Sequence, residues 1–93
     1  MTRTTKANVT AAFEYLCKEL GKRVATSYND VGAWRLDYAG CYGGYNIEEI
    51  INVHGGVTHP ITGQRMKANE MYDAIWFALR VLEVTNANAS KSA

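Results

Sequence analysis

The chain has little of several residue types that usually mark a function. Its 93 residues include two cysteines, two histidines and one proline. Lysine and arginine together number ten against nine acidic residues, so the formal net charge at pH 7 is only +1. A chain so close to neutrality lacks the strong positive charge that draws nucleic acid over long distances. The scarcity of cysteine and histidine argues against a disulfide framework and against the paired ligands of a structural zinc site.

Long apolar runs and signal-peptide organisation are also missing from the sequence. We therefore expect no membrane association and a cytoplasmic location, where Cys17 and Cys41 would be free thiols. The pairs Gly43-Gly44 and Gly55-Gly56 lack the spacing of a phosphate-binding loop. No set of residues forms a catalytic or metal motif, so we predict no enzymatic activity, no metal and no cofactor. A pairing of Cys41 with either histidine remains conceivable.

The sequence does contain enough apolar residues to build one core. Apolar residues make up 47% and charged residues 20% of the chain, which fits an ordinary globular domain. A chain of this length folds as one domain with a single core. We predict that this domain covers residues 1–84. Residues 85–93, TNANASKSA, are small and polar and are predicted to be a disordered tail.

Two segments have the periodicity of amphipathic helices. The first runs from about residue 7 to residue 20, and the glycine at position 21 is suited to end it. Its apolar stripe consists of Val9, Phe13, Leu16 and Leu20. The second helix is predicted over residues 67–84 and is apolar around most of its circumference. Its predicted core face consists of Met71, Ala74, Ile75, Ala78, Val81 and Leu82.

Three segments between these helices alternate apolar and polar residues, as strands do. They are predicted over about residues 24–28, 33–38 and 45–53. Short connections between successive strands favour an antiparallel meander. The sequence therefore predicts an α+β fold of order α-β-β-β-α, in which two helices pack on one face of a three-stranded antiparallel sheet.

The alternation in the third predicted strand is disturbed at Glu48-Glu49. Strict alternation would place Glu49 in line with Ile47 and Ile51, facing the core. A bulge would instead return Ile50 to the core face and leave both carboxylates in solvent. We favour the bulge, or an edge strand, because an unpaired buried carboxylate is costly.

The candidate binding surface combines one loop with one side of the second helix. Residues 54–65, HGGVTHPITGQR, form the longest connection and contain both histidines and the only proline. Long connections in small domains are often functional. On the second helix, Trp76 and Phe77 fall outside the core face, so they are either covered by another part of the chain or exposed at an interface. The predicted partner-binding residues are His54, His59, Gln64, Arg65, Lys67, Trp76, Phe77 and Arg80.

Two kinds of partner are compatible with this surface. Aromatic and arginine side chains dominate protein interfaces, so we predict a protein partner or a homodimer through residues 67–84. The alternative is nucleic acid, because double-stranded-RNA-binding domains share the α-β-β-β-α order and carry a basic start to their last helix. This chain has only Arg65 and Lys67 at that place, followed by Glu70 and Asp73.

The C-terminal half resembles a known group of proteins. The segment GGYNIEEIINVHGGV, a short loop and the helix opening MKANEMYDAIWFALRVLE are similar to small accessory proteins of tailed phages. The resemblance implies a non-enzymatic protein that works by stoichiometric binding. Such binding includes inhibition of host defences, as by anti-CRISPR proteins, in the host cytoplasm. No catalytic residue is implied.

Overall fold

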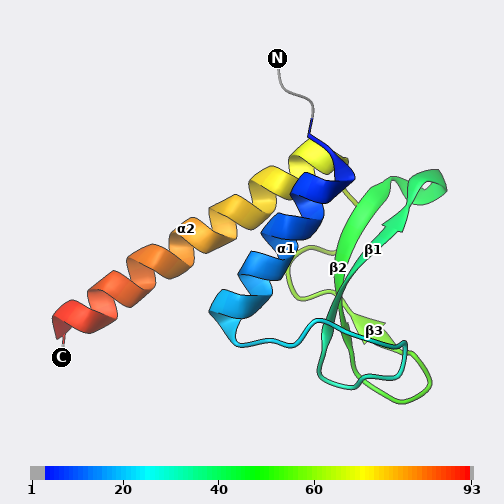
Figure 1. Ribbon diagram of the computed structural model, residues 1–93, viewed down its shortest axis with the longest axis horizontal. Helices are drawn as coiled ribbons and strands as arrows, with labels where there is room; N and C mark the ends of the chain where they lie inside the picture. Colours follow the sequence, from blue (N-terminus) through cyan, green and yellow to red (C-terminus); the bar gives the residue numbers. More distant parts are fainter. Residues whose placement is uncertain (1–3, 93) are drawn as a thin grey trace.

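A computed structural model describes residues 4–92 of the chain. The elements, in chain order, are α1 (Lys6–Leu20), β1 (Trp34–Ala39), the 3-10 helix η1 (Gly40–Tyr42), β2 (Gly44–Ile50), β3 (Val57–Thr58) and α2 (Ala68–Ser92). This order, shown in Figure 1, confirms the predicted α-β-β-β-α fold. Over the described part of the chain, neither helix is both long enough and apolar enough to cross a membrane.

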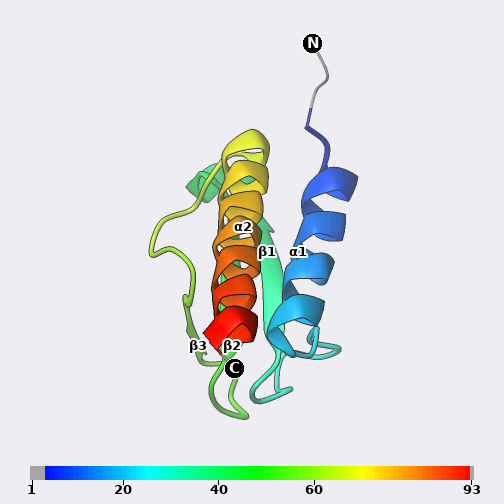
Figure 2. The ribbon, with the colours of Figure 1, turned by 90° about the vertical axis from the view of Figure 1, so that its left-hand side faces the viewer.

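The three strands form an antiparallel meander in the order β1-β2-β3, with β2 in the centre. Both helices lie on the same side of this sheet, as the view in Figure 2 shows. The molecule therefore has two layers, one of helices and one of strands, as the sequence predicted. Strand β3 pairs only with the last two residues of β2. The connection from β3 to α2 runs beside the rest of that edge of β2, where Met66 and Tyr45 exchange backbone hydrogen bonds.

Local side-chain contacts fix both ends of α1. The Thr5 hydroxyl accepts a hydrogen bond from the backbone N–H of Asn8, and the Asn8 side chain accepts one from the backbone N–H of Thr5. Asparagine thus takes the place of the glutamate that usually completes such a capping box. At the other end Gly21 has φ of 70°, the left-handed conformation that glycine adopts without steric cost.

Helix α2 is longer than predicted. It starts at Ala68, where Glu70 reaches back to accept a hydrogen bond from the backbone N–H of Lys67. It then continues to Ser92, through most of the segment that we expected to be a disordered tail. That segment contains neither glycine nor proline, so nothing in it breaks the helix. In Figure 1 the C-terminal half of α2 extends away from the rest of the domain.

The prediction of a strand over residues 24–28 was wrong. Only Val24 pairs with the sheet, through a single parallel bridge to Trp34. Turn-type contacts within the following residues replace sheet pairing. Asp30 accepts hydrogen bonds from the Thr26 backbone N–H and from the Arg23 guanidinium. The hydrogen bond from Arg23 is the main cause that lowers the pKa of Asp30 below its usual range.

The third strand lies inside the segment that we predicted to be a loop. Strand β2 ends at Ile50 rather than at residue 53, and the chain then turns back into β3, Val57–Thr58. The Asn52 side chain organises this turn, because its Oδ1 accepts hydrogen bonds from the backbone N–H groups of His54 and Gly56. The predicted number of strands was therefore right, but their positions were shifted along the chain.

The predicted bulge at Glu48-Glu49 was also wrong, and β2 is not an edge strand. The pairing of β1 with β2 is unbroken from Trp34 opposite Glu49 to Ala39 opposite Gly44. Strict alternation therefore places Glu49 on the helix side of the sheet, where it accepts a 2.7 Å hydrogen bond from the Trp34 indole N–H. Glu48 points to the opposite side and is buried, so the carboxylates are not both in solvent.

The core lies between the sheet and the two helices. Helix α1 packs chiefly along α2, and both contact the sheet. The residues that form this core are Val9, Ala12, Phe13, Leu16 and Cys17 of α1, Trp34, Tyr45 and Ile47 of the sheet, and Met71, Ile75 and Leu79 of α2. The predicted core face of α2 is thus correct for Met71 and Ile75, and Ala78 and Leu82 pack against the core while partly buried. Val81, by contrast, is exposed.

Two substitutions in α2 test this division between a buried and an exposed side. Ile75 is fully buried, so Ile75→Ala is expected to lower the free energy of unfolding by about 2–5 kcal/mol. Val81→Ala, on the exposed side, is the matched control and is expected to change it by about 0.5 kcal/mol or less. Urea unfolding followed by circular dichroism measures both. Equal losses for the two variants would contradict the observed packing.

Candidate functional site

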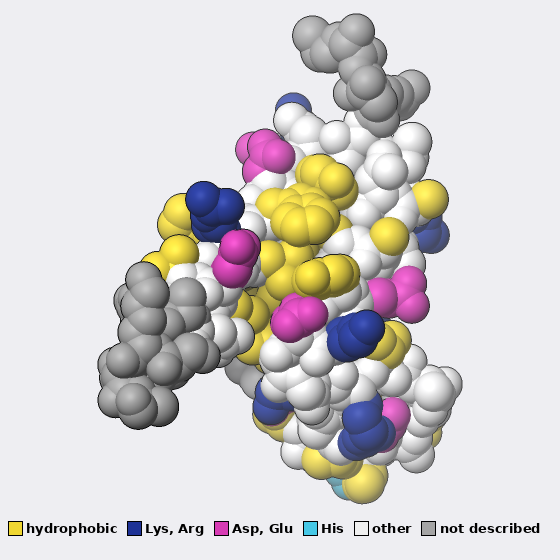
Figure 3. Space-filling view, turned by 60° about the vertical axis from the view of Figure 1, so that its left-hand side comes forward, with side chains coloured by type: hydrophobic (Ala, Val, Ile, Leu, Met, Phe, Trp, Pro, Cys, Tyr) yellow, Lys and Arg dark blue, Asp and Glu magenta, His cyan; other side chains and the backbone are white. Residues whose placement is uncertain are grey.

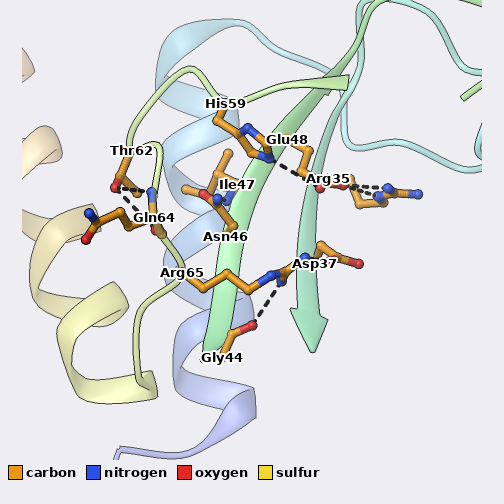
Figure 4. Close-up of polar contacts among 10 residues, drawn as sticks. All are labelled: Arg35, Asp37, Gly44, Asn46, Ile47, Glu48, His59, Thr62, Gln64 and Arg65. Atoms are coloured by element: carbon orange, nitrogen blue, oxygen red, sulfur yellow. Dashed lines mark hydrogen bonds and ion pairs between the residues drawn. The ribbon is translucent and has the colours of Figure 1, made fainter. Parts of the chain in front are cut away.

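The predicted partner-binding residues fall into two separate groups. His54, His59, Gln64, Arg65 and Lys67 lie on the segment between β2 and α2, whereas Trp76, Phe77 and Arg80 lie on α2. Figure 4 shows that Arg65 and His59 point to the face of the sheet that is turned away from the helices. The structure therefore does not join the loop and the helix into the single surface that the sequence suggested.

Arg65 is engaged in holding the chain together. Its guanidinium donates hydrogen bonds to Asp37 Oδ2 at 2.6 Å and to the carbonyl oxygen of Gly44 at 3.0 Å (Figure 4). Asp37 belongs to β1 and Gly44 to β2, so this one side chain fastens the connection before α2 to two strands. The hydrogen bond to Asp37 joins two charged groups, and such charge-assisted bonds are among the stronger ones in proteins.

His59 is part of a second polar contact on the same face of the sheet. Its Nε2 lies 3.5 Å from Glu48 Oε2, and the Arg35 Nε donates to Glu48 Oε1 at 3.0 Å (Figure 4). The Glu48 side chain is only 7% exposed, and its contact with the Arg35 guanidinium offsets the cost of burying a polar group. We read Arg35, Glu48 and His59 as a structural polar cluster that anchors the loop to the sheet.

The remaining loop residues are exposed and make few contacts. Gln64 donates from its backbone N–H to the Thr62 hydroxyl at 3.1 Å, and His54 lies in the turn after β2. Lys67 lines a shallow cavity of about 620 Å³ beside Lys6, where the N-terminal ends of the two helices meet the β1–β2 hairpin. None of these contacts brings the two histidines together with a cysteine.

Trp76 and Phe77 are both exposed, so neither is fully covered by another part of the chain. The side chain of Trp76 is 45% exposed and that of Phe77 is 72% exposed. Trp76 is covered in part by Tyr15 of α1 and by Tyr72 of its own helix.

A groove lies between α1 and α2. The two helices diverge toward their C-terminal ends (Figure 1). Its volume is about 370 Å³. Tyr15, Glu19, Trp76, Leu79, Arg80, Leu82, Glu83 and Asn86 line it. Figure 3 shows the apolar surface over the helices, with acidic and basic side chains around it.

Aromatic rings join the two walls of this groove. The rings of Tyr15 on α1 and Trp76 on α2 have centroids 6.0 Å apart in a tilted arrangement. Tyr72 contacts Trp76 edge-on from one turn earlier, with centroids 6.1 Å apart. These contacts fix the orientation of the Trp76 indole while leaving nearly half of it accessible. We call Tyr15, Trp76, Leu79 and Leu82 the helix groove.

Sequence reasoning identified Trp76 and Arg80 but missed Tyr15 and Glu19 of the same groove. Tyr15 lies beside Leu16 at the edge of the apolar stripe of α1, and this position was the only local sign of its role. The groove forms because two helices far apart in the sequence diverge in space. No periodicity within one helix contains that information.

The two cysteines occupy contrasting environments. Both are free thiols, as predicted, with Cys17 buried in the core and Cys41 exposed in η1. Burial, with a smaller contribution from the nearby charge of Glu14, raises the pKa of the Cys17 thiol to about 11. Across the described residues, no three His, Cys, Asp or Glu side chains gather as metal ligands.

Thiol labelling tests this contrast. At pH 8 a pKa of about 11 leaves roughly one Cys17 thiol in a thousand ionised, and the thiolate is the reactive form. An aromatic disulfide reagent is therefore expected to titrate one thiol rapidly in the native protein and the second only after unfolding. Cys41→Ser should remove the rapid phase. Rapid labelling of native Cys41→Ser protein would show that Cys17 is accessible.

Three comparisons, with protein-family models, with curated proteins and with solved structures, found no match for this chain. The similarity of the C-terminal half to accessory proteins of tailed phages stays a prediction.

Proposed function

We propose that this chain is a non-enzymatic protein-binding module that receives a helical segment of its partner in the helix groove. The observation that carries the proposal is the exposed, ordered indole of Trp76 beside Tyr15, above an apolar floor formed by Leu79 and Leu82. Tryptophan and tyrosine anchors of this kind contribute most to the binding energy of protein interfaces.

The shape of the groove favours a helix as the occupant. Its two walls are themselves helices, and a third helix laid between them would insert side chains in the way that helices pack on one another. Amphipathic peptides commonly bind other proteins by placing their apolar face in such a groove.

The charges at the rim favour a basic side chain on that helix. Glu19 of α1 and Glu83 of α2 line the groove on opposite sides, with Arg80 as the only lining cation among the described residues. A partner helix with apolar residues on one face and a lysine or arginine at its edge would complement this rim.

An enzymatic role receives less support from the placement of the ionisable groups. Glu48 contacts Arg35, Asp37 contacts Arg65 and Asp30 contacts Arg23, so each of these carboxylates already has a cationic partner within the fold. These pairs lie on the far face of the sheet or in the turn after α1. None of these three carboxylates lines the helix groove.

The phage-type role follows as part of the same proposal. A small protein that binds stoichiometrically through one groove could block the surface that its target needs, which is how an inhibitor of a host defence system would work. A cytoplasmic site of action is supported by the free thiol of Cys41 at the surface, which suits a reducing compartment.

The nucleic-acid alternative is less favoured, because Arg65 is already held by Asp37 and Gly44. A phosphate contact by Arg65 would require breaking that ion pair. Lys67 beside Lys6 remains available, but Glu70 lies in the first turn of the same helix and would repel a phosphate.

Substitution of Trp76 tests the proposed function. A partner protein that binds the wild-type chain stoichiometrically should bind the Trp76→Ala variant about thirtyfold more weakly. The reason is that loss of such an anchor costs about 2 kcal/mol of binding free energy. Tyr42→Ala is the matched control, because Tyr42 is equally aromatic, 76% exposed and located in η1 away from the groove. Calorimetry with the purified partner measures the affinities, and circular dichroism verifies that both variants are folded.

Two outcomes would contradict the proposal. Equal loss of binding in Trp76→Ala and Tyr42→Ala would mean that the groove is not the binding surface. If nuclease treatment releases the partner from the wild-type chain, and a Lys6→Ala/Lys67→Ala variant no longer binds it, the function would be assigned to nucleic-acid binding instead.

A further inference from the structure

The outer edge of β1 is an open edge of the sheet. Strand β1 pairs with β2 on one side, and the order β1-β2-β3 places no other strand of the described chain on its other side. Val24 alone touches this edge, through its parallel bridge to Trp34. The Trp34 N–H donates to the carbonyl oxygen of Arg23, and the Trp34 carbonyl oxygen accepts from the Ala25 N–H, both at 2.8 Å. The backbone groups of Trp34 therefore face away from β2.

Past this bridge, the backbone groups on the outer edge of β1 have no partner among the described residues. Backbone groups alternate in direction along a strand, so those of Leu36 and Tyr38 face the same way as those of Trp34. Outside the ladder to β2, no backbone hydrogen bond from a described residue reaches Leu36 or Tyr38. Their N–H groups and carbonyl oxygens thus stand in a row at strand spacing, and we call this row the β1 edge. Another extended chain is the partner that matches such a row.

A cavity beside the β1 edge has room for a side chain of an added strand. It lies between α1 and β1 and has a volume of about 280 Å³. Its lining includes Thr10, Phe13 and Glu14 of α1, Val24 and Ala25 of the bridge segment, and Leu36 of β1. In Figure 2, α2 lies over β2, whereas α1 is displaced to the side of β1 that is away from β2. A fourth strand would therefore continue the sheet beneath α1.

We propose that the β1 edge binds an extended segment of a partner protein as a fourth strand of the sheet. The bridge at Val24 shows that the edge accepts a neighbouring chain in this position. The backbone of the segment would bond to Leu36 and Tyr38, and one of its apolar side chains would enter the cavity against Phe13. The inference goes beyond the proposed function, because the β1 edge and its cavity share no residue with the helix groove. The two surfaces can therefore be tested separately.

Peptide selection tests the proposal, with a library of short random peptides displayed on phage as the probe. The wild-type chain should enrich peptides in which valine, isoleucine or threonine recur at alternate positions, because these residues favour strands. Thr10→Trp places a large side chain in the cavity and should weaken binding of the enriched peptide, made synthetically, about tenfold or more. Ala11→Trp is the matched control, because Ala11 is exposed on the same helix and does not line the cavity. It should leave the affinity unchanged.

Removal of single backbone N–H groups tests the strand geometry. In a strand every second N–H faces the neighbouring strand, so N-methylation at alternate positions of the peptide should weaken binding about fivefold or more at each position. Methylation at the positions between them should have little effect. On the protein, Tyr38→Pro removes an N–H that faces away from β2, and it should weaken binding more than Tyr38→Ala, which keeps that N–H. Calorimetry measures the affinities, and circular dichroism verifies that the variants are folded.

Three results would overturn the proposal. These are a library that yields no binding peptide, equal binding of the enriched peptide by the wild-type chain and Thr10→Trp, and sensitivity to N-methylation that does not alternate along the peptide. Trp76→Ala should leave binding at the β1 edge intact. A peptide that loses binding in Trp76→Ala but keeps it in Thr10→Trp would occupy the helix groove, which would support the proposed function and overturn this inference. Failure of the two proposals is therefore distinguishable.

Discussion

The packing of α2 against α1 and the sheet is the interaction on which the rest of the structure depends. A helix over a sheet this small can bury one stripe, and α2 uses Met71, Ile75 and Leu79 for that purpose. It is nevertheless 25 residues long and apolar on other sides as well. The surplus apolar surface, with Trp76 on one flank and Phe77 on the outer side, therefore stays in water. The proposed function of the molecule follows from this excess.

The sheet separates the two kinds of contact that hold the domain together. Strict alternation in β1 and β2 sends Ile47 toward the helices and Glu48 away from them, where Arg35 neutralises it. Arg65 then fastens the long connection to the polar face through Asp37. These charged side chains are therefore paired within the fold.

The sequence was sufficient to predict the element order and the two-layer arrangement, because periodicity reports which face of each element is buried. It was misleading where local contacts decide the conformation. Asp30 and Asn52 hold turns that displaced the first and third predicted strands. The expected bulge assumed that Glu49 would be an unpaired carboxylate on the core face, but Glu49 accepts a hydrogen bond from the Trp34 indole N–H. Trp76, Phe77 and Arg80 were identified from the helix pattern, whereas Tyr15 required knowledge of how two helices pack.

The central claim is that the apolar side chain of Trp76 is accessible in the monomer and fixed in the wall of a groove. Fluorescence of Trp34→Phe protein at low concentration isolates Trp76, because the chain has only two tryptophans. The structure predicts emission at long wavelength that neutral acrylamide quenches readily. Blue-shifted emission that resists quenching in the dilute monomer would show that Trp76 is covered by its own chain, and it would contradict the account.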